Sequence, residues 1–375
     1  SAFTQEGGPY EWSKMAFGRM QGAIAAVLYW VTNPLWVGGS LAFIATQAWN
    51  DNIFGIGAGS VGDYLFKLLF IWVSIGVAIV SLRRGKWIPN VGAFLRVIVL
   101  GFFTLTTIIY AIDNGVNGFP AGDLKPTGAI FLALVPVLIF NYVGFELQNG
   151  AAEEMENPQR DVPLSVLRSA ITGVLCYAIP IFAILIVLPL DKVTGIGGFL
   201  DAVTETFSVY GGAQDFLLGV MTIGFVVTLL TSGAVWMIGS DRILAVAAYD
   251  GAFLGFFGKF NAKLGTPVRV NVMSGIAASI FMILAVAAFN SGADSKFLVV
   301  LTIAISTTLI SYLWVFTSAV KLRFTHPHVH RPYRVPFGDA GLWIAGALTT
   351  FWVALGSWVA VFPGTLEKLF GIDYD

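Results

Sequence analysis

The stretch FNYVGFELQNGAAEEMENPQRDVP, residues 140–163, decides how this 375-residue chain folds. It continues an apolar run of membrane-spanning character, yet it places a carboxylate, Glu146, among amides and a glycine before that run has clearly ended. An ionisable residue inside a membrane span is costly, and by default it marks a functional position. What Glu146 does depends on whether this part of the chain is a span and where that span stops.

The composition is that of a protein embedded in a bilayer. Hydrophobic residues make up 57% of the chain and charged residues 11%, against about 25% charged in soluble domains. The net charge of −1 favours neither nucleic acid nor a broad acidic lipid surface as a partner. The single cysteine, Cys176, excludes a disulfide within the chain. Because the chain opens on a polar segment without an initiator methionine, we expect it to be a piece of a longer protein.

The apolar residues gather into runs that are each long enough, as helices, to cross a hydrocarbon core of about 30 Å. We therefore predict an all-α polytopic membrane protein. The nine predicted spans are residues 22–49, 65–82, 91–112, 128–157, 166–189, 216–248, 268–289, 297–320 and 342–362.

The basic residues orient these spans. Of the 21 Lys and Arg residues, 15 fall in alternate loops on one side, five on the other, and Arg96 lies within a span. Cytoplasmic loops carry the excess of positive charge. We therefore predict a cytoplasmic N-terminus, and with nine spans an external end at Asp375.

Two interpretations of Glu146 are open. If the fourth span is a regular helix from Gly128, the carboxylate lies near the inner boundary of the membrane and reaches water. If the helix breaks and continues to Asn157, the carboxylate falls near the middle of a segment of 30 residues. Pro136 and Gly144 favour the break, and non-helical backbone at membrane depth is tolerated where it lines a cavity.

Other polar residues within spans also have two interpretations. Arg96 either extends its long side chain to the inner interface or faces the bundle interior as a permanent cation. Asn33 precedes Pro34, which predicts a kink in the first span. The hydroxyls of Thr231 and Ser232 either bond their own helix or face a solute, and Trp236 on the same span suits an organic cation or a zwitterion.

Nothing in the sequence indicates an enzyme or a cofactor. The cluster HPHVH, residues 326–330, lies beside the basic segment PYRVP and is typical of an extended cytoplasmic loop more than of a metal site. Hydrolase, metalloprotease, phosphate-binding and dinucleotide-binding motifs are absent from the sequence.

Several motifs resemble those of amino acid permeases in the amino acid/polyamine/organocation (APC) superfamily. GFE followed by AAEEMENPQRDVP looks like the sixth transmembrane helix and its following loop, SDRILAVAAYDGAFL resembles the end of helix eight, and HRPYRVPFG resembles the loop before helix eleven. The segment QEGGPYEWSKMAFG with LYW resembles the entry into helix three. The resemblance covers essentially the whole chain.

This resemblance implies a LeuT-like inverted-repeat fold in which our nine spans are helices 3–11, with helix 1, most of helix 2 and helix 12 missing. The implied single domain has four parts: residues 1–21 (cytoplasmic loop), 22–127 (helices 3–5, the rest of the first repeat), 128–320 (helices 6–10, the second repeat) and 321–375 (cytoplasmic loop and helix 11).

The resemblance also implies site residues. Phe140 would be an aromatic gate, residues 141–144 the unwound stretch that binds substrate, and Glu146 an acidic residue at the start of the inner half of that helix. The remaining substrate-binding candidates are Asn141, Tyr142, Val143, Gly144, Trp236, Trp36, Val37, Thr307 and Ser311. Arg96, Thr231 and Ser232 are candidates for a coupling site. Arg96 falls where proton-coupled members often carry a lysine in place of a coupling sodium, and a guanidinium does not release its proton.

We therefore expect a secondary transporter, either a permease or an antiporter, that moves amino acids or related amines by alternating access. Its partners would be the small-molecule substrate, the lipid bilayer and a coupling ion that the sequence does not identify. The expected location is a cell membrane, specifically a bacterial inner membrane. The alternative is a non-transporting membrane scaffold or an inactive fragment. A channel would need a continuous polar stripe along several spans, which the sequence does not offer.

Overall fold

The computed structural model describes residues 2–3, 6–81, 87–116, 127–147, 149, 155–188, 197–288 and 293–369. The regular secondary structure of these residues is entirely helical, and eight helices are long and apolar enough to cross a membrane. A shorter apolar helix, α6 (Gly128–Phe140), occupies the place of the fourth predicted span. The predicted class, an all-α polytopic membrane protein, is confirmed, and the arrangement is consistent with an incomplete LeuT-like fold.

Apart from the fourth, the predicted spans match observed helices, with ends shifted by eight residues or fewer. In chain order the helices besides α6 are α1 (Pro9–Phe17), α2 (Arg19–Trp36), η1 (Val37–Leu41), α3 (Ala42–Asn52), α4 (Val61–Ser81), α5 (Trp87–Asn114), α7 (Pro158–Val187), α8 (Gly197–Thr206), η4 (Phe207–Ala213), α9 (Gln214–Tyr249), η5 (Gly255–Phe257), α10 (Val268–Ala288), α11 (Ala293–Thr325), α12 (Gly338–Val361) and α13 (Thr365–Leu369).

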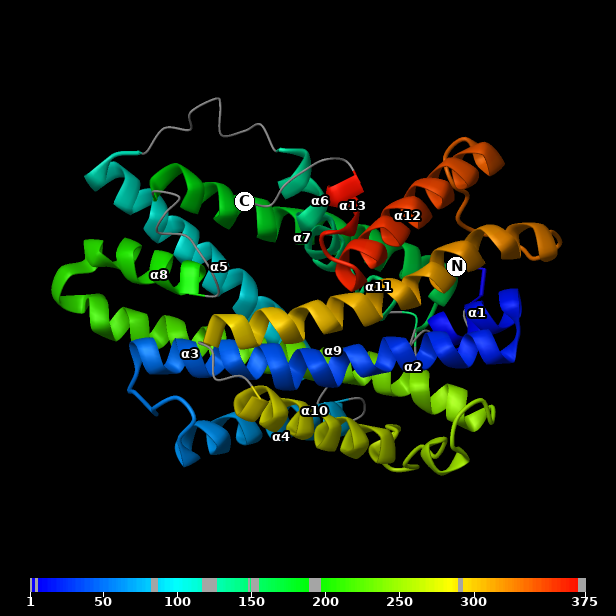
Figure 1. Ribbon diagram of the computed structural model, residues 1–375, viewed down its shortest axis with the longest axis horizontal. Helices are drawn as coiled ribbons and strands as arrows, with labels where there is room; N and C mark the ends of the chain where they lie inside the picture. Colours follow the sequence, from blue (N-terminus) through cyan, green and yellow to red (C-terminus); the bar gives the residue numbers. More distant parts are fainter. Residues whose placement is uncertain are drawn as a thin grey trace.

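Three long rods cross the middle of the molecule (Figure 1): the continuous span formed by α2, η1 and α3, and the helices α9 and α11. Helix α11 packs along α2 and α12, and α9 packs against α2, α4 and α5. Helices α4 and α10 lie together along one edge, while α5, α6 and α7 lie on the opposite side. The core therefore runs along the central rods.

The first span changes helical type after its proline. Helix α2 continues through Pro34 and then widens into the π-helical turn η1 (Val37–Leu41). Two buried glycines lie in this turn, and at Gly38 a side chain would collide with the carbonyl of Ala278 on α10. A π-helical segment thus follows the proline at which we predicted a kink, and its glycines let α10 approach closely.

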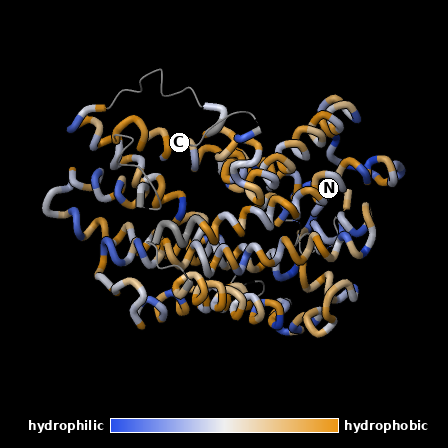
Figure 2. The backbone as a smooth tube through the Cα atoms, in the orientation of Figure 1, coloured by the Kyte–Doolittle hydropathy of each residue, from blue (hydrophilic) through white to orange (hydrophobic). Residues whose placement is uncertain are grey.

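Hydrophobic residues extend along the long helices, and hydrophilic residues lie mostly near their ends (Figure 2). Many large apolar side chains are exposed on α5 and α7, among them Phe94, Ile98, Ile171 and Phe182. Such outward apolar surface is what a bilayer solvates, so these two helices have the character of lipid-facing spans.

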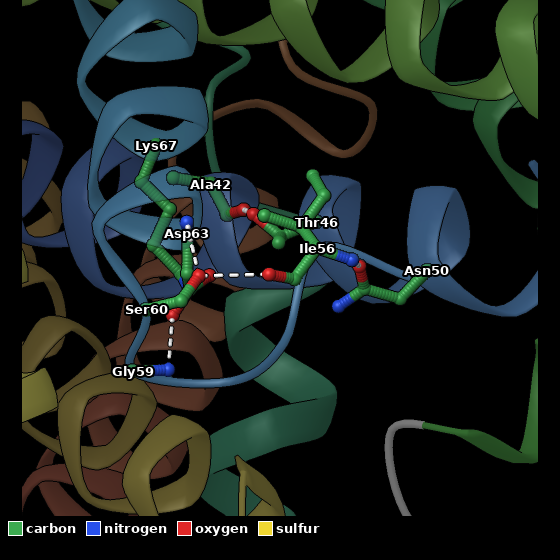
Figure 3. A network of polar contacts seen from close by, with 8 residues as sticks. All are labelled: Ala42, Thr46, Asn50, Ile56, Gly59, Ser60, Asp63 and Lys67. Atoms are coloured by element: carbon green, nitrogen blue, oxygen red, sulfur yellow. Dashed lines mark hydrogen bonds and ion pairs between the residues drawn. The ribbon is translucent and has the colours of Figure 1, made fainter. Parts of the chain in front are cut away.

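The turn between α3 and α4 is held by a compact polar network (Figure 3). The amide of Gly59 donates to Asp63 (3.0 Å), and the amide of Ile56 donates to the side chain of Asn50 (2.8 Å). Lys67 forms an ion pair with Asp63, and its ammonium lies 4.5 Å from the centre of the Phe43 ring. Both charged residues are buried, so each compensates the other where water is excluded.

Candidate functional site

The fourth span ends early, at the point where the sequence favoured a break. Helix α6 stops at Phe140, and residues 141–147 form successive turns instead of a regular helix. Gly144 has a φ of 104°, a conformation that residues with a Cβ rarely adopt. The straight-helix interpretation of this span is therefore wrong. The expected resumption of the helix falls partly on residues 150–154, which lie outside the described residues.

A second constraint on Gly144 comes from α9. A Cβ at this position would lie 2.9 Å from Cη2 and 3.0 Å from Cζ2 of Trp236. The indole thus lies directly against the broken backbone. Leu147, at the end of the break, packs against Gly239 one turn further along α9, where a Cβ on the glycine would collide with the leucine side chain. The break is positioned by its fit to α9.

Glu146 is buried, with 2% of its surface exposed. The hydroxyl of Tyr29 on α2 donates to Oε1 (2.5 Å), and the hydroxyl of Tyr312 on α11 donates to Oε2 (2.6 Å). Tyr312 also accepts a hydrogen bond from the amide of Gly144 (3.0 Å). The carboxylate therefore ties the break to two central helices, and it is not an interfacial residue that reaches water.

A cavity of about 640 Å³ opens on the other side of the break. Helices α5, α7 and α9 and the broken segment form its walls. Pockets of about 300–1,000 Å³ suit small molecules. Its lining comprises Pro89, Gly92, Ala93, Arg96, Asn141, Tyr142, Val143, Gly144, Phe145, Leu147, Val166, Ser169, Ala170, Gly173, Tyr177, Thr231, Ser232, Val235 and Trp236.

Eight of the residues singled out from the sequence line this cavity. They are Arg96, Asn141, Tyr142, Val143, Gly144, Thr231, Ser232 and Trp236. The guanidinium of Arg96 reaches across to α9, where its Nη2 lies 3.5 Å from the carbonyl of Thr228. That contact favours the interior interpretation of Arg96 over one in which it extends only to the membrane surface.

The other six predicted residues lie outside the cavity lining. Besides Glu146, Trp36 on α2 meets Phe140 edge to face, with ring centres 5.5 Å apart. Val37 is fully buried in the π-helical turn. On α11, Thr307 shares a hydrogen bond with Thr32 (2.8 Å), and Ser311 donates to a carbonyl of its own helix (2.7 Å). Of these side chains, Thr307 lies at the packing of α2 with α11.

Sequence reasoning missed a second buried carboxylate. Asp241 on α9 accepts hydrogen bonds from Asn271 (2.6 Å) and Ser274 (2.6 Å) of α10, and Trp30 of α2 donates to that serine (2.8 Å). The network joins three helices, and Asp241, Asn271 and Ser274 are themselves buried. The sequence alone could have identified Asp241, because it falls within the sixth predicted span and an acidic residue inside a span is a candidate functional residue by default.

The tyrosines that hold Glu146 were also missed. Tyr29 belongs to LYW in the first span and Tyr312 to SYLW in the eighth, and both side chains are about 1% exposed. A buried phenol needs a hydrogen-bond partner, so two tyrosines inside spans are candidates to meet a buried acid. Sequence spacing alone does not say that they do.

Helix α1 closes one end of the bundle against α2, α9 and α11. Asp250, just past α9, accepts a hydrogen bond from Tyr10 and pairs with Lys14 (3.2 Å). Glu6 pairs with Arg242 at 2.5 Å. The Tyr10 hydroxyl, followed by Lys14, holds the pKa of Asp250 below its usual range. This network fixes α1 at the side that the charge pattern predicts to be cytoplasmic.

A bundle of membrane-spanning helices with a solute-sized cavity at a broken span belongs to the class of multi-pass membrane proteins that move small molecules. Comparison of sequences gives the family. The family model described as Amino acid permease matches residues 1–368, and the chain belongs to this family. The family and the named relatives are transporters and not enzymes.

Relatives are similar over most of this chain. A protein named "Probable agmatine/putrescine antiporter AguD" from Lactococcus lactis subsp. lactis (strain IL1403) is 28% identical over 371 residues, covering 98% of this chain and 78% of that protein. The "Uncharacterized transporter lpg1691" of Legionella pneumophila is 28% identical over 352 residues, covering 90% and 73%. The "Methylthioribose transporter" of Bacillus subtilis (strain 168) is 25% identical over 320 residues, covering 82% and 65%.

Proposed function

We propose that this chain forms the transport core of a secondary carrier, a permease or exchanger for amino acids or related amines. The observation that carries the proposal is the cavity at the break, where Gly144 lies against Trp236 and exposed backbone of the turn at residues 141–144 contributes to the wall. Unwound backbone at membrane depth is tolerated when it lines such a cavity. The names of the relatives, among them an agmatine/putrescine antiporter and a methylthioribose transporter, support small organic solutes that a cavity of about 640 Å³ can hold.

In this proposal the solute contacts Asn141, Tyr142, Val143 and Gly144 of the break and Trp236 of α9. The carrier would alternate between two states in which the cavity opens to one side or the other. The ties between Glu146 and its two tyrosines, and between α1 and Asp250, would hold the predicted cytoplasmic side closed. Phe140 and Trp36, in contact behind the break, would move with it.

The finer topology belongs to the same proposal. The nine apolar segments would correspond to helices 3–11 of the LeuT-like fold, divided into repeats at residue 128, with the N-terminus cytoplasmic. The membrane would be a bacterial inner membrane. Arg96 holds its proton permanently, so coupling would proceed by exchange or through another group.

Counterflow in proteoliposomes tests the proposal. The full-length protein is reconstituted, the vesicles are loaded with an unlabelled mixed pool of amino acids and amines, and entry of each labelled solute is followed. We expect saturable uptake that requires an internal solute and is lost in Trp236→Ala. Absence of stimulated uptake by every solute, from protein shown to be folded, would leave the alternative of a non-transporting membrane scaffold.

A further inference from the structure

Arg96 is the one charged side chain among the described residues that line the cavity. The described part of the chain provides no carboxylate within ion-pairing distance of it, and its one hydrogen bond to these residues is the long approach to the Thr228 carbonyl. A guanidinium presents five N–H donors in a planar fork that matches a carboxylate. At membrane depth, an unpaired charge of this kind favours a counter-ion strongly.

The carboxylate of the break does not supply that counter-ion. Both oxygens of Glu146 accept hydrogen bonds from tyrosines, on the side of the break that faces α2 and α11. Glu146 lies outside the lining of the cavity. The fixed charge that a bound solute meets on these walls is therefore positive, and the remaining polar groups around it are amides and hydroxyls such as Asn141, Ser232 and Tyr177.

Resting on the carrier function proposed above, we infer that the cavity selects solutes that carry a carboxylate, which Arg96 binds, and discriminates against the same molecules without it. A zwitterion suits this lining, because its carboxylate can meet Arg96 while its ammonium lies against the aromatic face of Trp236 or Tyr142. A diamine or a decarboxylated amine would bring a second cation, or no anion, to the guanidinium. The specificity of this chain would thus differ from the one that the name of the Lactococcus lactis relative states for that protein.

Competition between matched pairs tests this inference. Arginine and agmatine, ornithine and putrescine, and phenylalanine and phenethylamine differ within each pair by the carboxylate alone. Each is added as a competitor of counterflow by the full-length protein with its best transported solute. In a pair whose members compete, we expect the amino acid to inhibit counterflow on the order of tenfold more strongly than its amine. A tenfold difference corresponds to one charge-assisted hydrogen bond.

Variants of Arg96 assign the effect to the guanidinium. In Arg96→Gln the ratio within that pair should fall to about threefold or less, and Arg96→Lys should retain part of it, because a lysine keeps the charge but not the fork. Arg168→Gln is the matched control, since Arg168 is an exposed arginine on α7 outside the cavity lining, and it should leave the ratio unchanged.

Amines that compete as well as their amino acids in the wild-type protein would overturn the inference while leaving the carrier proposal intact. An unchanged ratio in folded Arg96→Gln would do the same. If no solute shows counterflow, the carrier proposal itself fails, and the inference that rests on it fails with it.

Discussion

The Cη2 atom of Trp236 lies 2.9 Å from the position that a Cβ on residue 144 would take, so the tryptophan occupies the space left by the missing side chain of Gly144. The two residues lie 92 positions apart in the chain, so their fit is a tertiary contact. Here the backbone of the break and the indole of α9 form one wall of the cavity. Their fit is the first feature to test.

Gly144→Ala should abolish most counterflow. The substitution adds a methyl group in contact with the indole and forces an alanine to a φ of 104°, which costs about 1–3 kcal/mol. The melting temperature of the detergent-solubilised protein and the initial rate of uptake are the measurements. Gly101→Ala on α5, where a Cβ meets nothing within 4 Å, is the matched control.

The double variant Gly144→Ala with Trp236→Ala separates the two causes. If the contact with the indole dominates, the alanine should cost less stability in the Trp236→Ala background than in the wild type. If the backbone conformation dominates, the cost should be the same in both. Equal stability and transport of Gly144→Ala and wild type would contradict the account of the break.

Tyr29→Phe and Tyr312→Phe should each destabilise the protein by about 1.5–3 kcal/mol, because each removes a donor from a buried carboxylate. Glu146→Gln should restore part of that loss in either background, since an amide tolerates a missing donor better than a charge does. Thermal unfolding in detergent measures the effect. Tyr64→Phe on α4 serves as the control. An equally large loss of stability in Tyr64→Phe would mean that the hydrogen bonds from Tyr29 and Tyr312 to Glu146 do not account for the effect.

How far the sequence predicts this structure is clearest at the fourth span. Pro136 and Gly144 correctly indicate a break, because both residues disfavour a continuous helix. The direction in which Glu146 turns is not predictable, since successive turns have no period that assigns a face. Its partners on α2 and α11 lie more than 100 residues away in the chain, and no local pattern connects them.

The first span shows a different limit. Its length and Pro34 are readable, but the π-helical turn η1 is not, and it rotates every later residue away from the face that a period of 3.6 assigns. The family resemblance puts Trp36 and Val37 at the substrate; in the structure Trp36 contacts Phe140 at the end of α6, and Val37 is buried at the start of the π-helical turn. In contrast, Asp241 was predictable as an acid inside a span, and only its partners required the structure.

Asp250 should stabilise the fold above its ordinary titration range and not below it. Its folded pKa is lowered, mainly by the hydroxyl of Tyr10, so its contribution is complete above the unfolded pKa of about 4 and is lost as pH falls through the folded value. Asp250→Asn should lower the melting temperature at pH 7 by about 1–3 °C, a small effect because the side chain is partly exposed.

The difference between Asp250→Asn and wild type should shrink as the pH falls from 7 through the folded pKa of Asp250, because the carboxylate then becomes protonated in both states. Tyr10→Phe should reproduce part of the loss at pH 7, since it removes the donor that lowers the pKa. A difference that grows as the pH falls would have the wrong sign for a carboxylate held in its ionised form.

Removing one partner of the buried pair between Asp63 and Lys67 should be far more costly than removing both. Lys67→Met leaves the carboxylate of Asp63 buried without its cation and should cost about 3–5 kcal/mol. Asp63→Asn together with Lys67→Met leaves no isolated charge, so much of the stability should return. Thermal unfolding of the single and double variants forms a double-mutant cycle, and additive losses would show that the two charges act separately at this turn.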